Sequence, residues 1–189
     1  MRIAFIIYNG MTALDFIGVF DPVTRLKAMG IKSDLQWEIC SRTPEVSDVA
    51  GLRIMPTQVN QPLNNFDMII VPGGFIARRM VNDQAFIEWL KTAMPCSWKV
   101  SVCTGSLLLG AAGYLYGKKA TTHPSAYENL QPYCATVIDQ RIVEDGDVIT
   151  ARGVTSAIDL GLYLCEKFAG HDIKEKIRQQ MDYGMTFES

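Results

Sequence analysis

The sequence predicts an α/β protein with a mostly parallel central sheet and helices on both of its faces. Short apolar runs, typical of strands buried on both faces, alternate along the chain with longer stretches of helical periodicity. Strands separated in this way by helices pair in parallel, because each crossover returns the chain to the same edge of the sheet. We expect residues 1–189 to form a single domain.

The first part of the chain is expected to hold a buried strand, two helices, a second strand and a loose hairpin. A continuous apolar run at residues 3–7 predicts the first strand. Helical periodicity follows, and we expect it to be divided at Asp21 and Pro22, because Asp is a preferred N-cap and Pro fits the first turn of a new helix. The second of these helices should end near Gly30. Residues 35–39 predict the second strand and residues 47–57 the hairpin.

The second part of the chain continues the alternation of strands and helices. Residues 68–71 are a short apolar run cut off by Pro72, and residues 83–94 place Phe86 and Trp89 at helical spacing. The other predicted elements are a strand at 98–102, a small-residue helix at 104–112, a hairpin at 142–149 and closing helices at 154–168 and 172–183.

The composition disfavours several functional classes. Eighteen Lys and Arg residues oppose twenty Asp and Glu residues, so the chain has no basic excess for binding nucleic acid. No stretch approaches the roughly 18 uninterrupted apolar residues of a transmembrane helix. The five cysteines are odd in number and contain no C-x-x-C pair, which disfavours a disulfide framework and a zinc site. We therefore expect a cytoplasmic protein with reduced thiols, no metal, and neither a nucleic acid nor a membrane as partner.

Cys103 is the candidate catalytic residue that the sequence marks most clearly. Ligands of parallel α/β sheets bind beyond the carboxyl ends of the strands, and Cys103 stands where the strand at 98–102 turns directly into a helix. This is the arrangement of a nucleophile elbow, whose tight turn requires small neighbours such as Ser101 and Gly105. The positive end of the helix dipole is expected to lower the pKa of the thiol and make thiolate available. The alternative is a buried, unreactive cysteine.

Further candidates for the same site follow the other strands. Gly73 and Gly74 let the backbone approach a ligand closely, and the N–H groups of Gly74 and Thr104 are expected to form a pocket for an anionic intermediate. Asp15 stands among apolar neighbours, so burial should raise its pKa and allow it to exchange a proton with the thiol; the alternative for Asp15 is a helix cap. His123 either lines the site or supports the structure with its ring.

Six segments carry a resemblance to a known family: residues 14–18 (LDFIG), 71–74 (VPGG), 102–113 (VCTGSLLLGAAG), 119–123 (KATTH), 145–151 (DGDVITA) and 153–159 (GVTSAID). Together they resemble the ThiJ/PfpI superfamily, whose members have a class I glutamine amidotransferase-like fold. The resemblance covers nearly the whole chain. Within the superfamily the chain is most similar to isonitrile hydratases and to the amidotransferase-like domains of AraC-type regulators.

The resemblance implies a flavodoxin-like three-layer sandwich that forms a homodimer and works without a cofactor. It implies Cys103 as the nucleophile, Asp15 as its carboxylic-acid partner, and Thr104 and Gly74 as contributors to the site. The implied activity is that of a hydro-lyase acting on a small electrophilic molecule. Water adds to an isonitrile, R–N≡C, and the product is an N-substituted formamide.

The sequence departs from the family pattern at two places near the predicted site. Ile76 and Ala77 stand where relatives often carry Gly and Thr, and Pro124 follows His123 where hydratases tend to carry Trp. We expect both departures to alter the pocket wall and thereby the substrate. Thr104 in place of a histidine disfavours a PfpI-type protease or deglycase, and the lack of an H-x-E pair disfavours a glutamine amidotransferase. The remaining alternative is a redox- or ligand-sensing domain without turnover.

Overall fold

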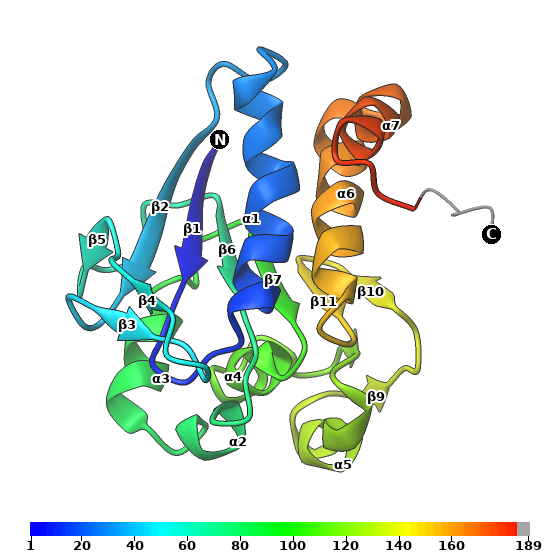
Figure 1. The fold of residues 1–189 in the computed structure, drawn as a ribbon. Helices are drawn as coiled ribbons and strands as arrows, with labels where there is room; N and C mark the ends of the chain where they lie inside the picture. Colours follow the sequence, from blue (N-terminus) through cyan, green and yellow to red (C-terminus); the bar gives the residue numbers. More distant parts are fainter. Residues whose placement is uncertain (185–189) are drawn as a thin grey trace.

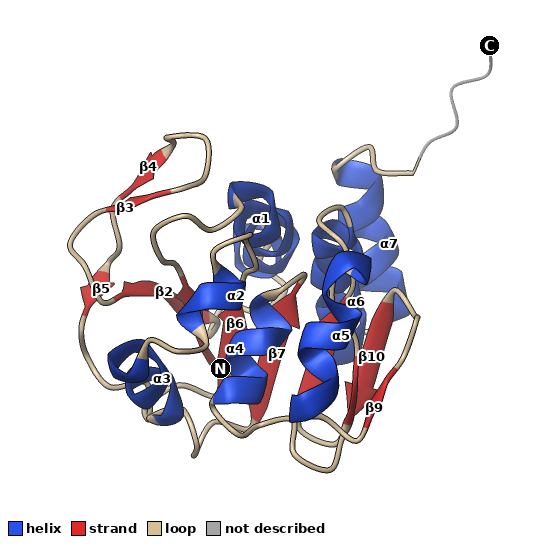
Figure 2. Ribbon diagram, turned by 90° about the horizontal axis from the view of Figure 1, so that it is seen from below, coloured by secondary structure: helices blue, strands red, loops and turns tan. Residues whose placement is uncertain are grey.

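A seven-stranded sheet lies at the centre of the molecule between two layers of helices (Figure 1; Figure 2). The structure is a computed structural model, and it describes residues 1–184. The main sheet contains β1 (Arg2–Ile6), β2 (Gln36–Ser41), β5 (Gln58–Val59), β6 (Met68–Val71), β7 (Trp98–Val102), β10 (Ile142–Asp145) and β11 (Val148–Ala151). Two short ladders pair β3 (Val46–Ser47) with β4 (Arg53–Ile54) and β8 (Lys119–Ala120) with β9 (Thr136–Val137). The α-helices are α1 (Ala13–Ala28), α2 (Ala77–Met80), α3 (Gln84–Lys91), α4 (Gly105–Ala111), α5 (Tyr127–Leu130), α6 (Ser156–Ala169) and α7 (His171–Gln180).

The topology of the main sheet confirms the predicted α/β class. The strands lie in the order β10-β11-β7-β6-β1-β2-β5. These neighbours pair in parallel, except that β10 and β11 form an antiparallel hairpin. Helices α1, α6 and α7 cover one face of the sheet, and α3, α4 and α5 cover the other (Figure 2).

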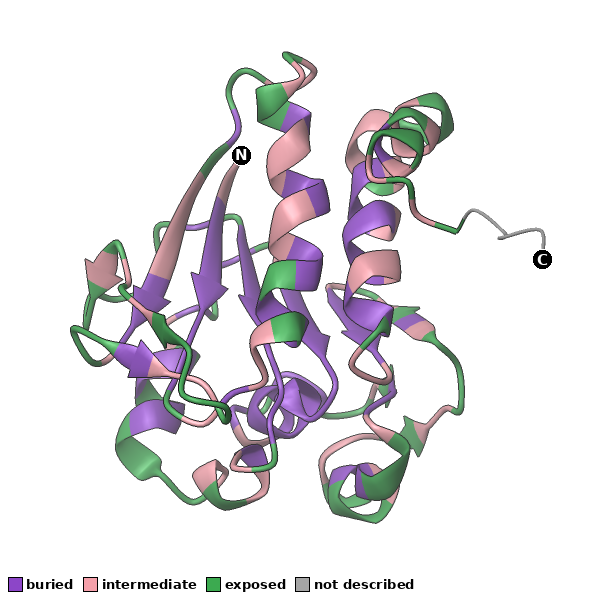
Figure 3. Cartoon of the chain, viewed as in Figure 1, coloured by how far each residue is buried: buried purple, intermediate pink, exposed green. Residues whose placement is uncertain are grey.

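The central strands are buried because helices cover both sides of the sheet (Figure 3). All four residues of β6 and the last four residues of β1 and of β7 are buried. This two-sided burial explains the continuous apolar runs of β1 and β6, which show no alternation with polar residues. Because the strands are parallel, their carboxyl ends meet at one edge of the sheet, and Pro72 and Cys103 directly follow β6 and β7 there.

The helix after β1 is continuous, so the predicted division at Asp21 and Pro22 is wrong. Pro22 lies inside α1 and packs against α6, where a Cβ atom placed on Gly161 would stand 2.3 Å from the proline ring. The Cys165 thiol of α6 donates to the Pro22 carbonyl at 3.3 Å. Asp21 caps no helix and pairs instead with Arg25 one turn later, at 2.9 Å. The stabilisation from the close packing of α1 on α6 therefore exceeds the cost of the backbone hydrogen bond that the proline removes from the helix.

The remaining predicted elements are present with small shifts of their ends. Both predicted hairpins form, and α3 begins after Asp83, whose carboxylate accepts from the Phe86 N–H at 3.0 Å. Helix α2 was not predicted, because four residues are too short to show periodicity. Within residues 1–184 no helix is long and apolar enough to cross a bilayer. Residues 185–189 of the predicted domain lie outside the described residues.

The contact between α1 and α6 makes a prediction about stability. In Gly161→Ala the new methyl group must displace the Pro22 ring, and such overpacking costs about 1–3 kcal/mol, partly offset by the higher helix propensity of alanine. We expect a net loss of about 1–2 kcal/mol in the free energy of unfolding, measured by urea titration. Gly153→Ala is the control, because nothing lies within 4 Å of its added Cβ. Equal midpoints for both variants would contradict this account.

Candidate active site

Cys103 occupies the tight turn between β7 and α4, as the sequence predicts. Its φ angle is +55°, a left-handed conformation that is uncommon for residues other than glycine. Its N–H donates to the Ala151 carbonyl at 2.9 Å, which ties the turn to β11. A Cβ atom at Gly105 would stand 2.3 Å from the Val71 carbonyl oxygen, so the start of α4 must be glycine. The elbow is therefore a strained turn held by its neighbours on both sides.

The turn formed by Pro72, Gly73 and Gly74 organises the residues around Cys103. The Gly73 N–H donates to Asp15 Oδ2 at 3.0 Å, and the Gly74 N–H donates to Thr104 Oγ1 at 2.9 Å. The Thr104 hydroxyl in turn donates to the Gly74 carbonyl at 2.8 Å. The expectation that the Gly74 N–H faces an anionic intermediate is thus not met in this structure. The N–H groups of Gly73 and Gly74 instead bind the side chains of Asp15 and Thr104 and hold them in place.

Asp15 is fully buried in the first turn of α1. The helix cap position belongs to Thr12, whose N–H donates to the Gly73 carbonyl at 2.9 Å, so Asp15 is not the cap. Burial raises the pKa of Asp15 to about 7, while the hydrogen bond from Gly73 lowers it in part. The predicted rise in pKa is confirmed. Within the described residues Asp15 Oδ1 has no hydrogen-bond partner, so this oxygen is available to take a proton.

The protonation state of Cys103 differs from the sequence-based expectation. Burial, and after it the negative charge of Asp15, together raise the pKa of its thiol to about 12. The N–H and hydroxyl groups of Thr104 lower this pKa but do not compensate. The predicted thiolate is therefore not the resting state of this site, because burial and the charge of Asp15 raise the pKa of the thiol more than Thr104 lowers it. Cys103 rests as a thiol and needs a base, and the neighbouring Asp15 has a suitable pKa.

A small pocket of about 180 Å³ opens onto Cys103. Several of its lining residues were not identified from the sequence, because their positions depend on how loops after different strands come together. Ile76 and Ala77, expected to alter this wall, do not line it: Ala77 is buried, and Ile76 faces a separate hollow of about 510 Å³ beside Tyr8. The pocket is lined by Thr12, Gly74, Phe75, Arg78, Cys103, Thr104, His123, Ser125 and Val154.

His123 both lines the pocket and supports a loop. Its Nδ1 accepts from the Ser125 N–H at 3.2 Å and lies 2.8 Å from Ser125 Oγ. These contacts start the 3-10 helix Pro124–Ala126, so the two roles considered for this ring coexist. Pro124 itself begins that helix and does not line the pocket. The other histidine, His171, lies on the surface and contacts Glu166 at 3.0 Å.

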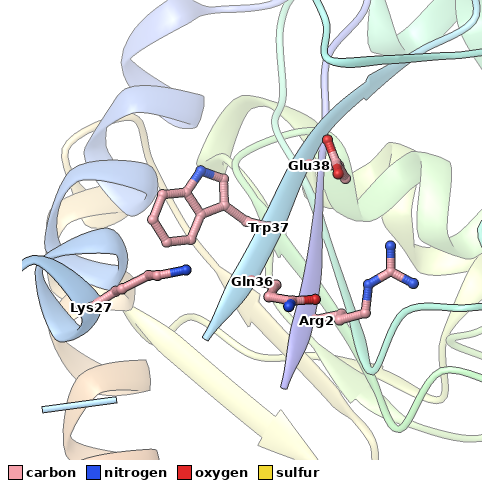
Figure 4. A pocket seen from close by; sticks show the side chains of 5 residues that line it. All are labelled: Arg2, Lys27, Gln36, Trp37 and Glu38. Carbon is pink, nitrogen blue, oxygen red and sulfur yellow. The ribbon is translucent and has the colours of Figure 1, made fainter. Parts of the chain in front are cut away.

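Figure 4 shows a different hollow, of about 440 Å³, at the opposite edge of the sheet. Arg2 and Gln36 begin β1 and β2, whereas Cys103 follows the carboxyl end of β7. Trp37 and Lys27 lie together there, with the Lys27 nitrogen 5.5 Å from the ring centroid. This hollow is therefore not part of the Cys103 site. Within residues 1–184 no cluster of three or more His, Cys, Asp or Glu side chains is arranged to bind a metal ion.

The coupling between Asp15 and Cys103 gives a prediction about thiol reactivity. In Asp15→Asn the charge that raises the pKa of Cys103 is absent, so the thiol should ionise at lower pH. A shift of about one unit multiplies the thiolate fraction roughly tenfold at mildly alkaline pH. The rate of modification by iodoacetamide, followed by mass spectrometry of the Cys103 peptide across pH, measures this change.

Asp21→Asn is the matched control for this experiment. Asp21 lies on the same helix but pairs with Arg25. Its substitution should leave the rate at Cys103 as in the wild type. If Asp15→Asn also leaves that rate unchanged across pH, the two buried groups are not coupled.

Comparison with known proteins agrees with this geometry. The model of the DJ-1/PfpI family matches residues 1–167. The isonitrile hydratase of Pseudomonas putida is 32% identical over 184 residues, which are 97% of this chain and 78% of the relative. The HTH-type transcriptional regulator CdhR of Pseudomonas aeruginosa is 28% identical over 185 residues, 95% of this chain and 54% of the regulator.

Solved structures show the same fold. A ThiJ/PfpI family protein from Pseudomonas syringae has a TM-score of 0.86 and 29% identity, covering 100% of this chain and 77% of that protein. Drosophila melanogaster DJ-1beta has a TM-score of 0.82 at 20% identity, covering 97% of this chain and 98% of that protein. With the family model matching most of its length, this chain belongs to the DJ-1/PfpI family.

Proposed function

We propose that the protein is a cysteine-dependent enzyme that adds water to an isonitrile to give an N-substituted formamide. The observation that carries this proposal is the pairing of a buried thiol on a strained elbow with a buried carboxyl whose pKa is about 7. A pKa near the working pH suits a group that must both accept and return a proton. The similarity to the isonitrile hydratase of Pseudomonas putida supports this choice of reaction.

In the proposed reaction Asp15 Oδ1 takes the proton of the Cys103 thiol, and the sulfur forms a bond to the terminal carbon of R–N≡C. The same proton passes from Asp15 to that carbon, which gives the thioimidate R–N=CH–S on Cys103. Water then adds to this carbon, and one of its protons goes to nitrogen. The C–S bond breaks as the remaining hydroxyl proton returns to sulfur through Asp15, and R–NH–CHO is released.

The other predicted site residues are assigned supporting roles. The Thr104 N–H lowers the pKa of Cys103, so it stabilises the sulfur as negative charge develops. Gly73 and Gly74 hold Asp15 and Thr104 through their N–H groups. His123 forms part of the pocket wall next to the substrate.

A sensor without turnover is the second candidate. The similarity to the regulator CdhR favours a ligand-sensing form of this candidate. A peroxide sensor needs the same activation of the Cys103 thiol by Asp15, because thiol oxidation proceeds through the thiolate. Formation of a formamide product separates the enzyme from either kind of sensor.

The test of the proposed reaction is formamide production from cyclohexyl isonitrile, followed by chromatography. We expect turnover by the wild type and a loss of about three orders of magnitude or more in Cys103→Ala, because no other thiol lines the pocket. Cys134→Ala is the control, since this partly exposed cysteine lies outside the pocket. Turnover that persists in Cys103→Ala rules out the covalent route. Folded wild-type protein that turns over neither this neutral isonitrile nor one that carries a carboxylate shifts the assignment to the sensor.

We further propose that residues 1–189 form one domain that assembles as a homodimer in the cytoplasm. The five cysteines are all free, which is typical of a reducing compartment. Exposed apolar side chains gather where the β3–β4 hairpin meets the start of α1, and the Val49 N–H donates to the Met11 carbonyl at 2.9 Å there. Contiguous apolar surface of this kind marks interfaces. The exposed residues at this junction are Leu14, Ile17, Val49, Leu52 and Met55.

The proposed homodimer predicts that a negative charge introduced on the exposed apolar side of α1 weakens the association of the two subunits. In Ile17→Glu a carboxylate would be buried at the interface without a partner, so we expect the dimer to dissociate into monomers. Light scattering coupled to size-exclusion chromatography measures the mass. Tyr116→Glu is the control, because Tyr116 is 89% exposed and lies after α4, away from this junction. A dimer that tolerates Ile17→Glu must use another surface.

A further inference from the structure

Arg78 lines the Cys103 pocket, and the proposed reaction makes no use of it. Its Nη2 donates to the backbone carbonyl of Ser125 at 3.1 Å and to Ser125 Oγ at 2.9 Å. Its guanidinium also lies over the ring of Phe75, 5.2 Å from the centroid. These contacts hold the guanidinium in one place. They leave Nε and Nη1 without a hydrogen-bond acceptor among the described residues.

The positive charge of Arg78 has no acidic partner in the part of the chain that the structure describes. No Asp or Glu among residues 1–184 forms an ion pair with it, and no acidic residue lines the pocket. The side chain is half-buried, whereas the neighbouring Arg79 is exposed and is not among the residues that line the pocket. A fixed guanidinium with free N–H groups and no carboxylate partner of its own binds an anionic carboxylate through charge-assisted hydrogen bonds.

We propose that Arg78 binds a carboxylate group of the substrate, and that the substrate class is small electrophiles that carry a carboxylate close to the reactive carbon. This inference rests on the proposed role of Cys103 as nucleophile. The pocket volume of about 180 Å³ is below the roughly 300–1,000 Å³ of sites for drug-sized ligands. Such a volume keeps the carboxylate near the reactive carbon. In the isonitrile reaction the class corresponds to short isocyano carboxylates.

His123 adds a second donor to this anion site. Its Nδ1 accepts from the Ser125 N–H, so the ring carries a hydrogen on Nε2. Ser125 Oγ accepts from Arg78 Nη2 and lies 2.8 Å from the same Nδ1. Ser125 therefore contacts both the Arg78 guanidinium and the His123 imidazole, so one residue orients both of these pocket-lining groups.

Two alkylating reagents of nearly equal shape test the proposal without any isonitrile. Iodoacetate carries a carboxylate where iodoacetamide carries a neutral amide. In both cases the Cys103 thiolate forms an S–C bond and iodide leaves, so the thiolate fraction cancels in the ratio of the two rates. That ratio is measured by mass spectrometry of the Cys103 peptide in wild type, Arg78→Gln, Arg78→Lys and Arg79→Gln.

We expect the iodoacetate-to-iodoacetamide ratio to fall roughly tenfold or more in Arg78→Gln, as the loss of a charge-assisted contact predicts. Arg78→Lys should retain part of the ratio, since it keeps the positive charge without the planar, fixed donor groups of the guanidinium. Arg79→Gln changes the net charge equally and should leave the ratio as in the wild type. A ratio that is the same in Arg78→Gln and the wild type overturns the proposal and leaves Arg78 a role in holding the Ser125 loop.

A second measurement keeps this test separate from the proposed function. If neither reagent modifies Cys103, the assignment of Cys103 as the nucleophile is wrong. The anion site is then tested separately by NMR titration of Cys103→Ala protein with propionate. The chain has two histidines, so the His123 ring signals report on the pocket and those of His171 serve as an internal control. Propionate-induced shifts of the His123 signals that vanish when Arg78→Gln is added to the Cys103→Ala protein support the carboxylate site. Unshifted His123 signals in Cys103→Ala protein refute it.

Discussion

The turn at the end of β6 is the constraint on which the rest of the site depends. Two consecutive N–H groups, those of Gly73 and Gly74, bind Asp15 from α1 and Thr104 from the elbow. The Tyr8 hydroxyl, at the end of β1, donates to the Pro72 carbonyl at 2.9 Å and supports the same turn. Three neighbouring strands are thereby joined at their carboxyl ends by hydrogen bonds that solvent does not reach. Buried bonds of this kind are costly to leave unmade, so they maintain one arrangement of the site.

Burial then decides how the site holds its protons. An ionised carboxylate and a thiolate side by side in an apolar interior repel one another and are both poorly solvated. The pair therefore keeps one proton in the range above the pKa of Asp15, about 7, and below that of Cys103, about 12. That proton resides on sulfur at rest and passes to the carboxylate when the sulfur attacks an electrophile. Desolvation, which makes the thiol a weak acid, also makes the carboxyl a base of useful strength.

The packing of α1 on α6 links this chemistry to the fold. Asp15 can reach the turn after β6 because the first turn of α1 lies against it, and Gly161 lets the Pro22 region of α1 approach α6 closely. On the other side of Cys103, Arg78 from the short helix α2 and His123 from the loop after β8 meet at Ser125. The reactive pair thus lies at the carboxyl edge of the sheet and the start of α1, whereas the rest of the pocket wall comes from short segments that follow other strands.

The sequence by itself determined the strand and helix alternation, the elbow at Cys103 and the raised pKa of Asp15, because these follow from local patterns: apolar runs, a strand–Cys–Thr–Gly turn and a carboxyl among apolar neighbours. Only the tertiary structure decided that Pro22 stays within one helix, since that depends on a contact with Gly161 far along the chain. It also decided that the Cys103 thiol has a high pKa, because desolvation sums over atoms from every element around the sulfur. The same holds for Arg78, whose place in the pocket is set by Ser125, a residue that sequence spacing does not connect to it.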